Sequence, residues 1–471
     1  MAQQSKQASV AVIGAGPGGY AAAFLAADLG MDVALIDPEA NPGGVCLYRG
    51  CIPTKALLHA CSVKREMERA REWGLSTEKR DIDIDKLRSW KDAVVKKLTS
   101  GLGQISAKRS IRYIRGRASF KDAQHLAIQT ANGKNEALAF ENAIIATGAY
   151  PASLKGLSFD SPRIMDSASA LNIADIPERL LVIGGGYIGL EMGTIYATLG
   201  SKVTIVEMMD QLLPGTDADL VKTYLKAAKD VYESVHTGTI AEVKESKKGL
   251  DVTLKTGEES QKASFDKVLL TVGRKPATNG LDLENTGVST NDKGFIEVDT
   301  QQRTHEANIF AIGDVCSAPL LAHKAAHEGR TAAEVIAGKA AAFAPHAIPA
   351  VEYTDPEIAQ CGMRPDEAEA QGLETETSSF PWAASGRALT LGRPEGLTKL
   401  TVEKGTGRVL GAGIVGAGAG ELIAEVVLAV EMGATVADLA MTIHPHPTLS
   451  ETIMQAAEMF EGTATDIFKP G

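Results

Sequence analysis

The sequence contains one pattern twice, and this repeat constrains the fold more than any other feature. Each copy has an apolar strand, a glycine-rich turn, a helix and a second strand that ends in an acid. The first copy extends from Ser9 to Asp37 and the second from Leu180 to Glu207. In both copies 23 positions separate the first glycine from the acid (37 − 14 and 207 − 184). Two such units predict two nucleotide-binding domains with parallel sheets.

The parts of each copy have a physical reason to occur in this order. We expect strands at 9–13, 32–37, 180–183 and 202–207, turns at 14–19 and 184–189, and helices at 20–29 and 190–199. Glycine lets the backbone approach a pyrophosphate, the helix N-terminus offers free N–H groups, and the acid accepts hydrogen bonds from ribose hydroxyls. The alternative for each copy is a turn that only packs a helix against a strand. We favour two dinucleotide sites.

Two cysteines follow the first copy. Cys46 and Cys51 lie in GGVCLYRGCIPTK, residues 43–55. Five steps of about 1.5 Å along a regular helix exceed the usual Cα separation of a disulfide, so the segment must be irregular if the cysteines pair. The glycines and Pro53 favour such an irregularity. A bridge that closes so short a loop restricts the unfolded chain little, which indicates a chemical use. A zinc site would need further ligands, and none surround the pair, so we expect no metal.

Composition narrows the class of protein. A chain of 471 residues, 44% of them apolar, can bury several cores. Five cysteines are too few for a secreted disulfide scaffold, and Met1–Ala8 is polar, so we expect a cytoplasmic protein. The net charge of −11 argues against a nucleic-acid partner, and no apolar run is long enough to span a membrane. The basic stretch Lys91–Arg117 is expected to be the solvated face of helices.

The remaining sequence suggests further units. Residues 98–140 alternate polar and apolar with a turn signal at Asn132-Gly133, which predicts an antiparallel insertion, and 151–177 is expected to cross into the second nucleotide domain. We expect a strand at 309–314 that ends in acid, a helix at 322–337, strands at 397–401 and 409–415, and helices at 421–432 and 448–460. The last third is therefore predicted to be a separate α+β domain.

These features form an ordered set. The two glycine fingerprints, the cysteine pair, Ala146-Thr147-Gly148, Gly313-Asp314 and the terminal HPHPTLSE (444–451) occur along essentially the full length. In that order they resemble the flavin-dependent pyridine nucleotide-disulfide oxidoreductases, and within them the branch that oxidises dihydrolipoamide. The resemblance implies an α/β fold with two Rossmann-like domains, for FAD and NAD, and a C-terminal α+β dimerisation domain. The expected domains are 1–150 (FAD and the redox disulfide), 151–276 (NAD), 277–346 (central, completing the FAD site) and 347–471 (interface).

The resemblance also implies the cofactor-binding residues. For FAD these are Gly14, Gly16, Gly19 and Asp37, with Thr147, Gly148 and Asp314; for NAD they are Gly184, Gly186, Gly189 and Glu207, with Gly273 also counted as cofactor-binding. Lys55 is implied to pair with Glu191 near the flavin. Family members often carry glutamate where Asp37 stands. Asp314 could instead cap a helix, and Lys55 and Glu191 could be ordinary solvent-facing residues.

Glu207 bears on the choice of nicotinamide cofactor. A carboxylate facing a ribose 2′-hydroxyl accepts hydrogen bonds but repels a 2′-phosphate, which favours NAD over NADP. Residues 208–210, Met-Met-Asp, offer no arginine for that phosphate, and Arg274 is a weaker candidate because it lies elsewhere in the chain.

The catalytic set follows from the same resemblance. Cys46 would meet the substrate and Cys51 would face the flavin. An imidazole suits proton removal from a dithiol near neutral pH, so His446 is the candidate base, with Glu451 to orient it. The resemblance implies that His446 acts across a two-fold dimer interface. The alternative is that His446-Pro447 only forms a turn that starts a helix at Thr448.

The implied reaction is oxidation of protein-bound dihydrolipoamide to lipoamide with reduction of NAD. The implied partners are a second copy of the chain and the lipoyl domains of an acyltransferase (E2) in a 2-oxoacid dehydrogenase complex, or the glycine cleavage H protein. One alternative is another disulfide reductase of the same family. Glu207 disfavours an NADPH-dependent glutathione reductase. A mercuric ion reductase would need a cysteine pair near the C-terminus, and no cysteine follows Cys361. The other is a mainly structural complex subunit, against which the intact motifs argue.

Two groups of residues remain. Tyr48 and Arg49 depart from the family pattern and either tune substrate access or repack the loop. Cys61, Cys316 and Cys361 are expected to be small apolar residues.

Overall fold

The first glycine turn joins the strands and helix that the sequence predicts. The computed structural model describes residues 6–75, 82–246 and 249–467, so the first five residues of the polar segment 1–8 lie outside the described residues. Strand β1 (Lys6–Ile13) leads through the turn into helix α1 (Pro17–Asp28) and strand β2 (Val33–Asp37). Helix α1 starts at Pro17, earlier than predicted, because proline suits the first helical position. The second half of the glycine turn is thus already helical.

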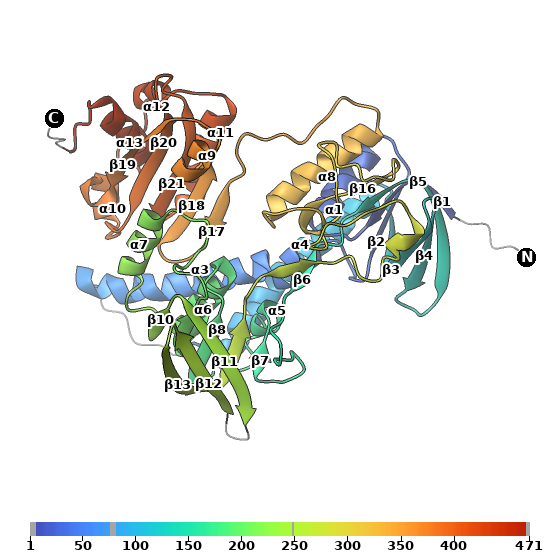
Figure 1. Cartoon of the computed structure of the whole chain (residues 1–471), viewed down its shortest axis with the longest axis horizontal. Helices are drawn as coiled ribbons and strands as arrows, with labels where there is room; N and C mark the ends of the chain where they lie inside the picture. Colours follow the sequence, from blue (N-terminus) through green and yellow to red (C-terminus); the bar gives the residue numbers. More distant parts are fainter. Residues whose placement is uncertain (1–5, 76–81, 247–248, 468–471) are drawn as a thin grey trace, which may run out of the picture.

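The first sheet combines parallel and antiparallel strands. Strand β1 pairs in parallel with β2 and with β5 (Asn135–Ile145), and β5 pairs in parallel with β16 (Ile309–Ala311). Strand β3 (Arg112–Asp122) begins parallel to β2 and continues antiparallel to β4 (His125–Thr130), which returns to β5. Helix α8 (Ala322–Ile336) lies beside α1 although about 300 residues separate them (Figure 1). The strand at 309 and the helix at 322 are confirmed.

The insertion between the two copies differs from the prediction at its start. Residues 98–108 belong to helix α4 (Ile84–Lys108), where a strand pattern was expected. Asp83 caps this helix by accepting a hydrogen bond from Lys86 N at 3.0 Å, and the helix, which contains no proline, continues through Gly101 and Gly103. The antiparallel part is β3 to β5, with the predicted turn at Asn132-Gly133 between β4 and β5.

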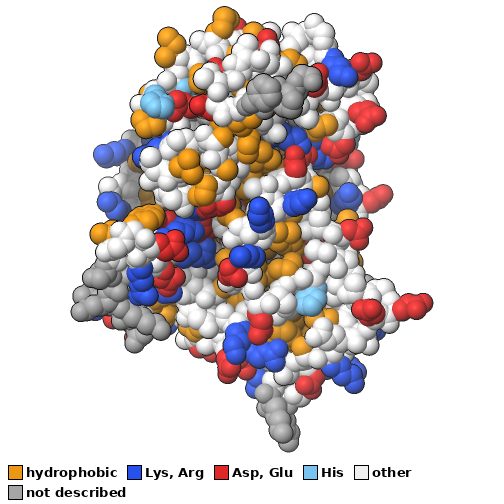
Figure 2. Space-filling view, turned by 90° about the vertical axis from the view of Figure 1, so that its left-hand side faces the viewer, with side chains coloured by type: hydrophobic (Ala, Val, Ile, Leu, Met, Phe, Trp, Pro, Cys, Tyr) orange, Lys and Arg blue, Asp and Glu red, His pale blue; other side chains and the backbone are white. Residues whose placement is uncertain are grey.

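The basic stretch 91–117 is not one solvated helix face. Lys91 is buried, with Nζ 3.0 Å from the Leu171 carbonyl oxygen, and residues from Arg112 onward are in β3. The prediction was wrong for Lys91 because its ammonium group satisfies a carbonyl of the neighbouring nucleotide-binding unit. On the face shown in Figure 2, Lys and Arg side chains are intermingled with Asp and Glu rather than gathered into one basic surface.

The second glycine fingerprint builds a fully parallel sheet. Its strand order is β10 (Ser234–His236), β9 (Lys202–Val206), β8 (Arg179–Ile183), β14 (Lys267–Leu270) and β7 (Ile164–Met165). The helices are α5 (Ser167–Ala170), α6 (Tyr187–Leu199) and α7 (Ala218–Ala227). Helix α6 also begins inside its turn, at Tyr187, and not at Leu190 as predicted.

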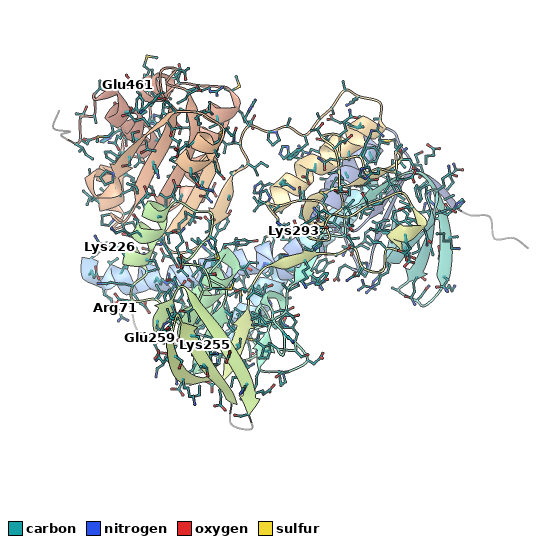
Figure 3. The ribbon with its side chains drawn as sticks, viewed as in Figure 1. Arg71, Lys226, Lys255, Glu259, Lys293 and Glu461 are labelled. Carbon is teal, nitrogen blue, oxygen red and sulfur yellow. The ribbon has the colours of Figure 1, made fainter. Side chains whose placement is uncertain are left out.

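An antiparallel sheet extends from this unit. It comprises β11 (Thr239–Ser246), β12 (Gly249–Thr256) and β13 (Glu259–Phe265). Its exposed Lys255 and Glu259 are labelled in Figure 3. The short strands β6 (Ala149–Pro151) and β15 (Arg274–Pro276) pair antiparallel and connect this unit to the first.

The last third is an α+β unit, as predicted. Its antiparallel sheet has the order β17 (Ala350–Glu352), β18 (Glu357–Gly362), β21 (Val409–Gly416), β20 (Leu397–Glu403) and β19 (Thr375–Pro381). Its helices are α9 (Pro365–Ala370), α10 (Gly386–Thr390), α11 (Ala419–Glu431), α12 (Val436–Met441) and α13 (Glu451–Glu461). Helix α13 starts at Glu451 and not at Thr448, so His446-Pro447 does not start it directly.

Two helices carry the cysteine segment into the middle of the molecule. They are α2 (Gly44–Arg49) and the long α3 (Cys51–Arg69), and α3 packs against α6 (Figure 1). Short 3₁₀ turns occupy Ala70–Trp73, Leu283–Asn285, Gly313–Val315 and Trp382–Ala384. Among the described residues, no helix combines the length and apolarity needed to cross a membrane. The α/β class with a C-terminal α+β unit is confirmed, whereas the domain boundaries at 150, 276 and 346 stay predictions.

Candidate active site

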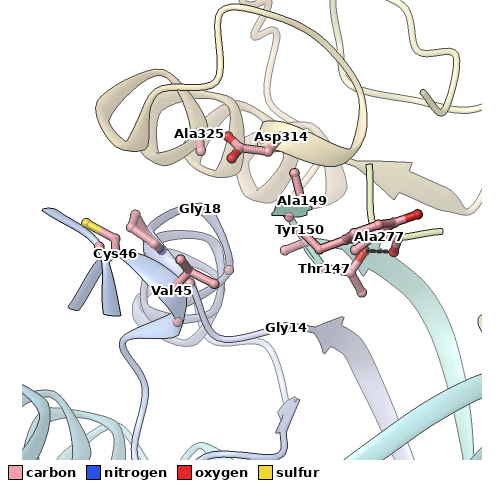
Figure 4. Close-up of a pocket in the computed structure, with 18 of the residues that line it drawn as sticks. Gly14, Gly18, Val45, Cys46, Thr147, Ala149, Tyr150, Ala277, Asp314 and Ala325 are labelled. Atoms are coloured by element: carbon pink, nitrogen blue, oxygen red, sulfur yellow. Dashed lines mark hydrogen bonds between the residues drawn. The ribbon is translucent and has the colours of Figure 1, made fainter. Parts of the chain in front are cut away.

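A pocket of about 700 Å³ brings the first fingerprint and the cysteine pair together. Of the residues predicted from the sequence, it is lined by Gly14, Gly16, Gly19, Asp37, Cys46, Cys51, Lys55, Thr147, Gly148, Glu191 and Asp314. Figure 4 shows Gly14, Cys46 and Asp314 around the same space, with Thr147 bonded to the Ala277 carbonyl oxygen at 2.8 Å. The first sheet, α2, α3, α6 and the turn after β16 all contribute. The roles of these residues stay predictions, but the structure places them in one site.

The glycines of the first turn do not all serve the same purpose. A Cβ on Gly14 would collide with the Ala146 carbonyl oxygen, and a Cβ on Gly19 with the carbonyl oxygen of Gly14, so packing alone explains both. Gly16 caps α1 with φ −70°, and a Cβ there would meet no protein atom closer than 4.0 Å. Gly16 therefore needs to be glycine only if something outside the chain approaches its backbone. A pyrophosphate at the N-terminus of α1 fits this space.

Asp37 closes the turn from the end of β2. Its Oδ2 accepts a hydrogen bond from Ala15 N at 2.7 Å, and its Oδ1 accepts one from Glu39 N at 2.9 Å. Burial raises the pKa of this carboxyl, and the charge of Arg49 acts against that rise. Each carboxylate oxygen still has a second lone pair, so Asp37 can brace the turn and also receive ribose hydroxyls.

The two residues between the cysteines have separate contacts. The Tyr48 hydroxyl donates to the Asn41 carbonyl oxygen at 3.0 Å and accepts from Asn41 N at 3.2 Å, which ties α2 to the preceding loop. Arg49 lines the pocket and pairs with Glu39 beside Asp37. The Tyr48 contacts are therefore those of loop packing, and Arg49 lies at the Asp37 end of the pocket.

The cysteine segment is broken between the two thiols. Cys46 lies in α2, Cys51 opens α3, and Gly50 between the helices has φ −145° and ψ −116°. A Cβ on Gly50 would press against the Val45 carbonyl oxygen at 2.9 Å. The break brings the two side chains into contact. The segment is thus irregular between the cysteines, as it must be if they pair. Both cysteines are free and half-buried in this structure.

Contact with each other makes the two thiols unequal. A hydrogen bond from the Cys46 thiol lowers the pKa of Cys51 to about 7 against the opposing effect of burial, and the charge of Lys55 adds to this lowering. The same hydrogen bond, together with burial, raises the pKa of Cys46 far above its ordinary value. In the reduced pair, Cys51 is therefore the thiol that ionises first, and Cys46 keeps its proton.

Lys55 and Glu191 form an ion pair at the pocket. Lys55 Nζ donates to both carboxylate oxygens, at 2.9 and 2.8 Å, and Glu191 is almost completely buried. Tyr353 N donates to Glu191 Oε1 at 3.0 Å, and the Tyr353 ring lies 4.4 Å from Lys55 Nζ. The predicted pairing is present, and the alternative of two solvent-facing side chains is wrong.

Asp314 faces the pocket from the 3₁₀ turn Gly313–Val315. The alternative that it caps a helix is wrong, because α8 begins at Ala322 with Leu321 as its N-cap residue. Behind the turn, Gly313 N donates to Glu328 Oε2 at 2.6 Å, and Glu328 pairs with Lys324, also at 2.6 Å. This buried pair fixes the turn and leaves the Asp314 carboxyl free to receive hydroxyl groups of a ligand. Burial raises the pKa of Asp314.

The second fingerprint repeats the geometry of the first at a separate position. Packing explains Gly184 and Gly189, whose Cβ atoms would collide with the carbonyl oxygens of Thr271 and Gly184, whereas a Cβ on Gly186 would meet nothing within 4 Å. Glu207 accepts from Gly185 N at 2.7 Å and Met209 N at 2.8 Å, as Asp37 does in the first copy. Both turns therefore fit a dinucleotide.

Gly273 and Arg274 lie between the two units. The Gly273 carbonyl oxygen accepts from Ala152 N at 3.0 Å, next to the paired strands β6 and β15. Arg274 donates to the Ala149 carbonyl oxygen, and its Nε lies 4.0 Å from Asp314. Arg274 thus belongs to the first pocket and does not accompany Glu207.

His446 and Glu451 form a pair outside this pocket. His446 Nδ1 lies 2.9 Å from Glu451 Oε1, and Thr448 N donates to Glu451 Oε2 at 2.7 Å. The imidazole side chain is 80% exposed, so Nε2 is available to another molecule. Within one chain, His446 does not line the pocket that holds the cysteines. Among the described residues, no group of three or more His, Cys, Asp or Glu side chains could hold a metal ion.

Sequence reasoning missed some pocket residues. Tyr187 and Ile188 reach the first pocket from the second glycine turn, and Arg117 reaches it from β3. Glu352 is buried at the end of β17, close enough to Lys55 and Glu191 for their charges to act on it. Only Tyr187 and Ile188 carry a sequence signal, their place inside the turn. The other two depend on long-range packing that no local pattern reports.

Family models match almost the whole chain. Residues 8–329 match the model described as pyridine nucleotide-disulphide oxidoreductase, and residues 348–457 match the dimerisation domain of the same family. The chain is similar to curated dihydrolipoyl dehydrogenases: 45% identical over 462 residues to that of Vibrio cholerae (98% of this chain, 97% of the relative) and 44% identical over 458 residues to that of Geobacillus stearothermophilus (97% of each).

Solved structures show the same fold. The crystal structure of LpdA from Mycobacterium tuberculosis has a TM-score of 0.89 at 26% identity, covering 97% of this chain and 99% of that one. The HOCl-induced flavoprotein disulfide reductase RclA from Escherichia coli has a TM-score of 0.84 at 27% identity, covering 96% and 99%. The match to a dimerisation domain supports a homodimer.

Proposed function

The chain belongs to the pyridine nucleotide-disulphide oxidoreductase family, and we propose that it is a dihydrolipoyl dehydrogenase that oxidises protein-bound dihydrolipoamide to lipoamide and reduces NAD. The observation that carries this proposal is the contact between Cys46 and Cys51 inside the pocket built by the first glycine fingerprint. The curated relatives of this activity match nearly the full length of the chain.

FAD fits the first pocket. Gly16 and the N-terminus of α1 would hold its pyrophosphate, Asp37 its adenosine ribose and Asp314 its ribityl chain, while Lys55 and Glu191 would lie by the flavin ring. Bound there, FAD supplies the two-electron carrier between the thiol pair and NAD. The second fingerprint, with Gly186 and Glu207, would hold NAD.

The thiols act by exchange from the Cys46–Cys51 disulfide. A substrate thiolate attacks the Cys46 sulfur, the Cys46–Cys51 bond breaks, and Cys51 leaves as a thiolate. The second substrate thiolate then attacks the substrate sulfur bound to Cys46, which forms lipoamide and releases Cys46 with both electrons left on the enzyme pair. Cys51 leaves as a thiolate because the charge of Lys55 favours its ionised form, and the hydrogen bond from the Cys46 thiol adds to this effect once Cys46 has been released.

Proton transfer is assigned to His446 of the partner subunit. Its exposed imidazole would take the thiol protons of the substrate and return one to Cys46, whose raised pKa favours protonation on departure. Glu451 contacts Nδ1 and orients the imidazole ring. The proposed partners are lipoyl domains of a 2-oxoacid dehydrogenase acyltransferase or the glycine cleavage H protein.

The proposal is tested by NADH formation from NAD and dihydrolipoamide, with NADP and glutathione as parallel arms. We expect turnover with NAD and dihydrolipoamide only. Cys46→Ser should abolish this turnover but spare the reduction of an artificial dye by NADH, because the dye does not need the thiols. Cys361→Ser, which changes a buried cysteine in the C-terminal unit, is the matched control and should retain both activities. Glutathione reduction with NADPH, or no response to dihydrolipoamide, would reject the assignment.

A further inference from the structure

Glu352 is a buried carboxyl without full hydrogen bonding. It is the last residue of β17, its exposed fraction is 6%, and no described residue supplies a hydrogen bond to its Oε2. The next residue, Tyr353, donates its backbone N–H to Glu191, so the end of β17 is anchored directly on the Lys55–Glu191 ion pair. A buried, incompletely bonded carboxylate is costly unless it takes up a proton.

The charges around Glu352 belong to that pair. Lys55 on α3 lowers its pKa and Glu191 on α6 raises it, while the residue opposite on β18 is the apolar Ile358. Lys55 is already bonded to both oxygens of Glu191, which also accepts from Tyr353 N. The Glu191 carboxylate thus accepts from Lys55 and from Tyr353 N, whereas Glu352 Oε2 has no partner among the described residues. Burial raises the pKa of Glu352 to about 7.

We infer that Glu352 is a positioning residue of the redox site, which acts through the Lys55–Glu191 pair by taking up one proton and keeping the three-residue set neutral. In this state the positive charge of Lys55 and the negative charge of Glu191 balance. When Glu352 loses its proton, the set carries one net negative charge, and two of its members, Lys55 and Glu191, line the pocket that holds Cys51. This charge opposes the Cys51 thiolate and any further negative charge in the pocket.

The inference gives an expected pH dependence. Because the pKa of Glu352 is raised in the folded protein, the folded state binds more protons than the unfolded state between about pH 4.5 and pH 7. Stability then falls as pH rises through that window and levels off above it. Replacing Glu352 by glutamine removes the ionisation and with it this loss of stability. The stability of the variant relative to the natural protein should therefore increase as pH rises through the same window.

The test compares the holoenzyme with Glu352→Gln and Glu352→Ala in three measurements between pH 5 and pH 9. The infrared band of a protonated carboxyl should disappear near pH 7 in the natural protein and be absent from both variants. The melting temperature of Glu352→Gln minus that of the natural protein should grow up to about pH 7 and then stay constant. The kcat ratio of Glu352→Gln to the natural protein should be near one at pH 6 and rise severalfold by pH 8.5.

The matched control is Glu357→Gln. Glu357 is half-buried and burial raises its pKa too, but it accepts from Gly420 N and is influenced by Glu421, Asp355 and Arg393 rather than by the ion pair. We expect no change in its kcat profile relative to the natural protein. A carboxyl band that is missing at pH 6, or an unchanged kcat profile in both Glu352 variants, would overturn the inference. Glu352→Ala decides the kcat question if Glu352→Gln does not fold.

Only the kcat measurement rests on the proposed function, because it uses dihydrolipoamide as the substrate. Infrared and melting measurements need no substrate, so they report on Glu352 even if dihydrolipoamide is not the substrate. In that case the kcat comparison is left out, because dye reduction does not use the thiols, and the infrared and melting measurements decide alone. A protein that ignores dihydrolipoamide but loses its carboxyl band near pH 7 rejects the proposed substrate and keeps the inference.

Discussion

The difference in acidity between Cys46 and Cys51 comes from a single contact. In the reduced pair the Cys46 thiol donates a hydrogen bond to Cys51, so Cys51 is the sulfur that ionises and Cys46, which the proposal has the substrate thiolate attack in the disulfide, keeps its proton. The sequence places the two cysteines five positions apart and predicts an irregular backbone between them, since Gly50 and Pro53 disfavour a helix that continues from Cys46. It does not predict the contact, which depends on the φ and ψ adopted at Gly50.

His446, whose imidazole is exposed, is the residue to which the proposed mechanism assigns proton transfer. Replacing it by glutamine should slow dihydrolipoamide oxidation by roughly 10²- to 10⁴-fold, because a neutral amide cannot accept the thiol proton. FAD content and NADH-driven dye reduction should stay unchanged. Steady-state kinetics at saturating NAD measure this effect.

His444 provides the matched control for that substitution. It lies two residues away, but its Nε2 contacts Glu425 at 2.7 Å and its side chain is almost completely buried. His444→Gln should therefore affect packing more than turnover and lower kcat by much less than His446→Gln. Equal losses in both variants would show that the segment, and not the His446 imidazole, is what the reaction needs.

At the scale of the element, each glycine turn contains glycines that packing requires and one glycine that leaves space for a ligand. Gly14, Gly19, Gly184 and Gly189 approach backbone atoms of the chain itself, whereas Gly16 and Gly186 leave open space. The repeat in the sequence predicts both turns, because identical spacing imposes the same strand, turn and helix. It does not predict that α1 and α6 begin inside the turns, nor that residues 98–108 are helical, since an alternating pattern in a short window does not exclude a helix.

The open space gives a direct prediction for two alanine variants. Gly16→Ala should fold but lose FAD, because its Cβ would occupy the space for the pyrophosphate; Gly186→Ala should fold, keep FAD and raise the KM for NAD by about 10-fold or more. Flavin absorbance after gel filtration and NAD titration measure these outcomes. Gly19→Ala, which collides with the Gly14 carbonyl oxygen, should instead fail to fold. FAD retained at full occupancy in Gly16→Ala would show that the pyrophosphate does not bind at this turn.

At the scale of the whole molecule, the proposed site needs residues of two chains. Cys46 lines the pocket between the two nucleotide-binding units, and His446 is exposed on the C-terminal unit, which matches the family dimerisation domain. Four large apolar side chains of that unit are also strongly exposed: Leu428, Met432, Met441 and Ile443. Their exposure in a single chain fits a surface that a second copy covers. Composition and periodicity do not predict this pairing, because they say nothing of where a second chain lies; the expectation comes from the family resemblance of the ordered motifs.

The central claim is that Cys46 of one subunit works with the partner subunit's His446. The most direct test mixes Cys46→Ser and His446→Gln subunits at equal amounts and measures NADH formation from NAD and dihydrolipoamide. Each mixed dimer would contain one intact site, so random pairing should restore about a quarter of the natural activity although each variant alone is inactive or nearly so. Activity that stays at the level of the separate variants, in samples where mixed dimers are shown to form, would contradict the claim.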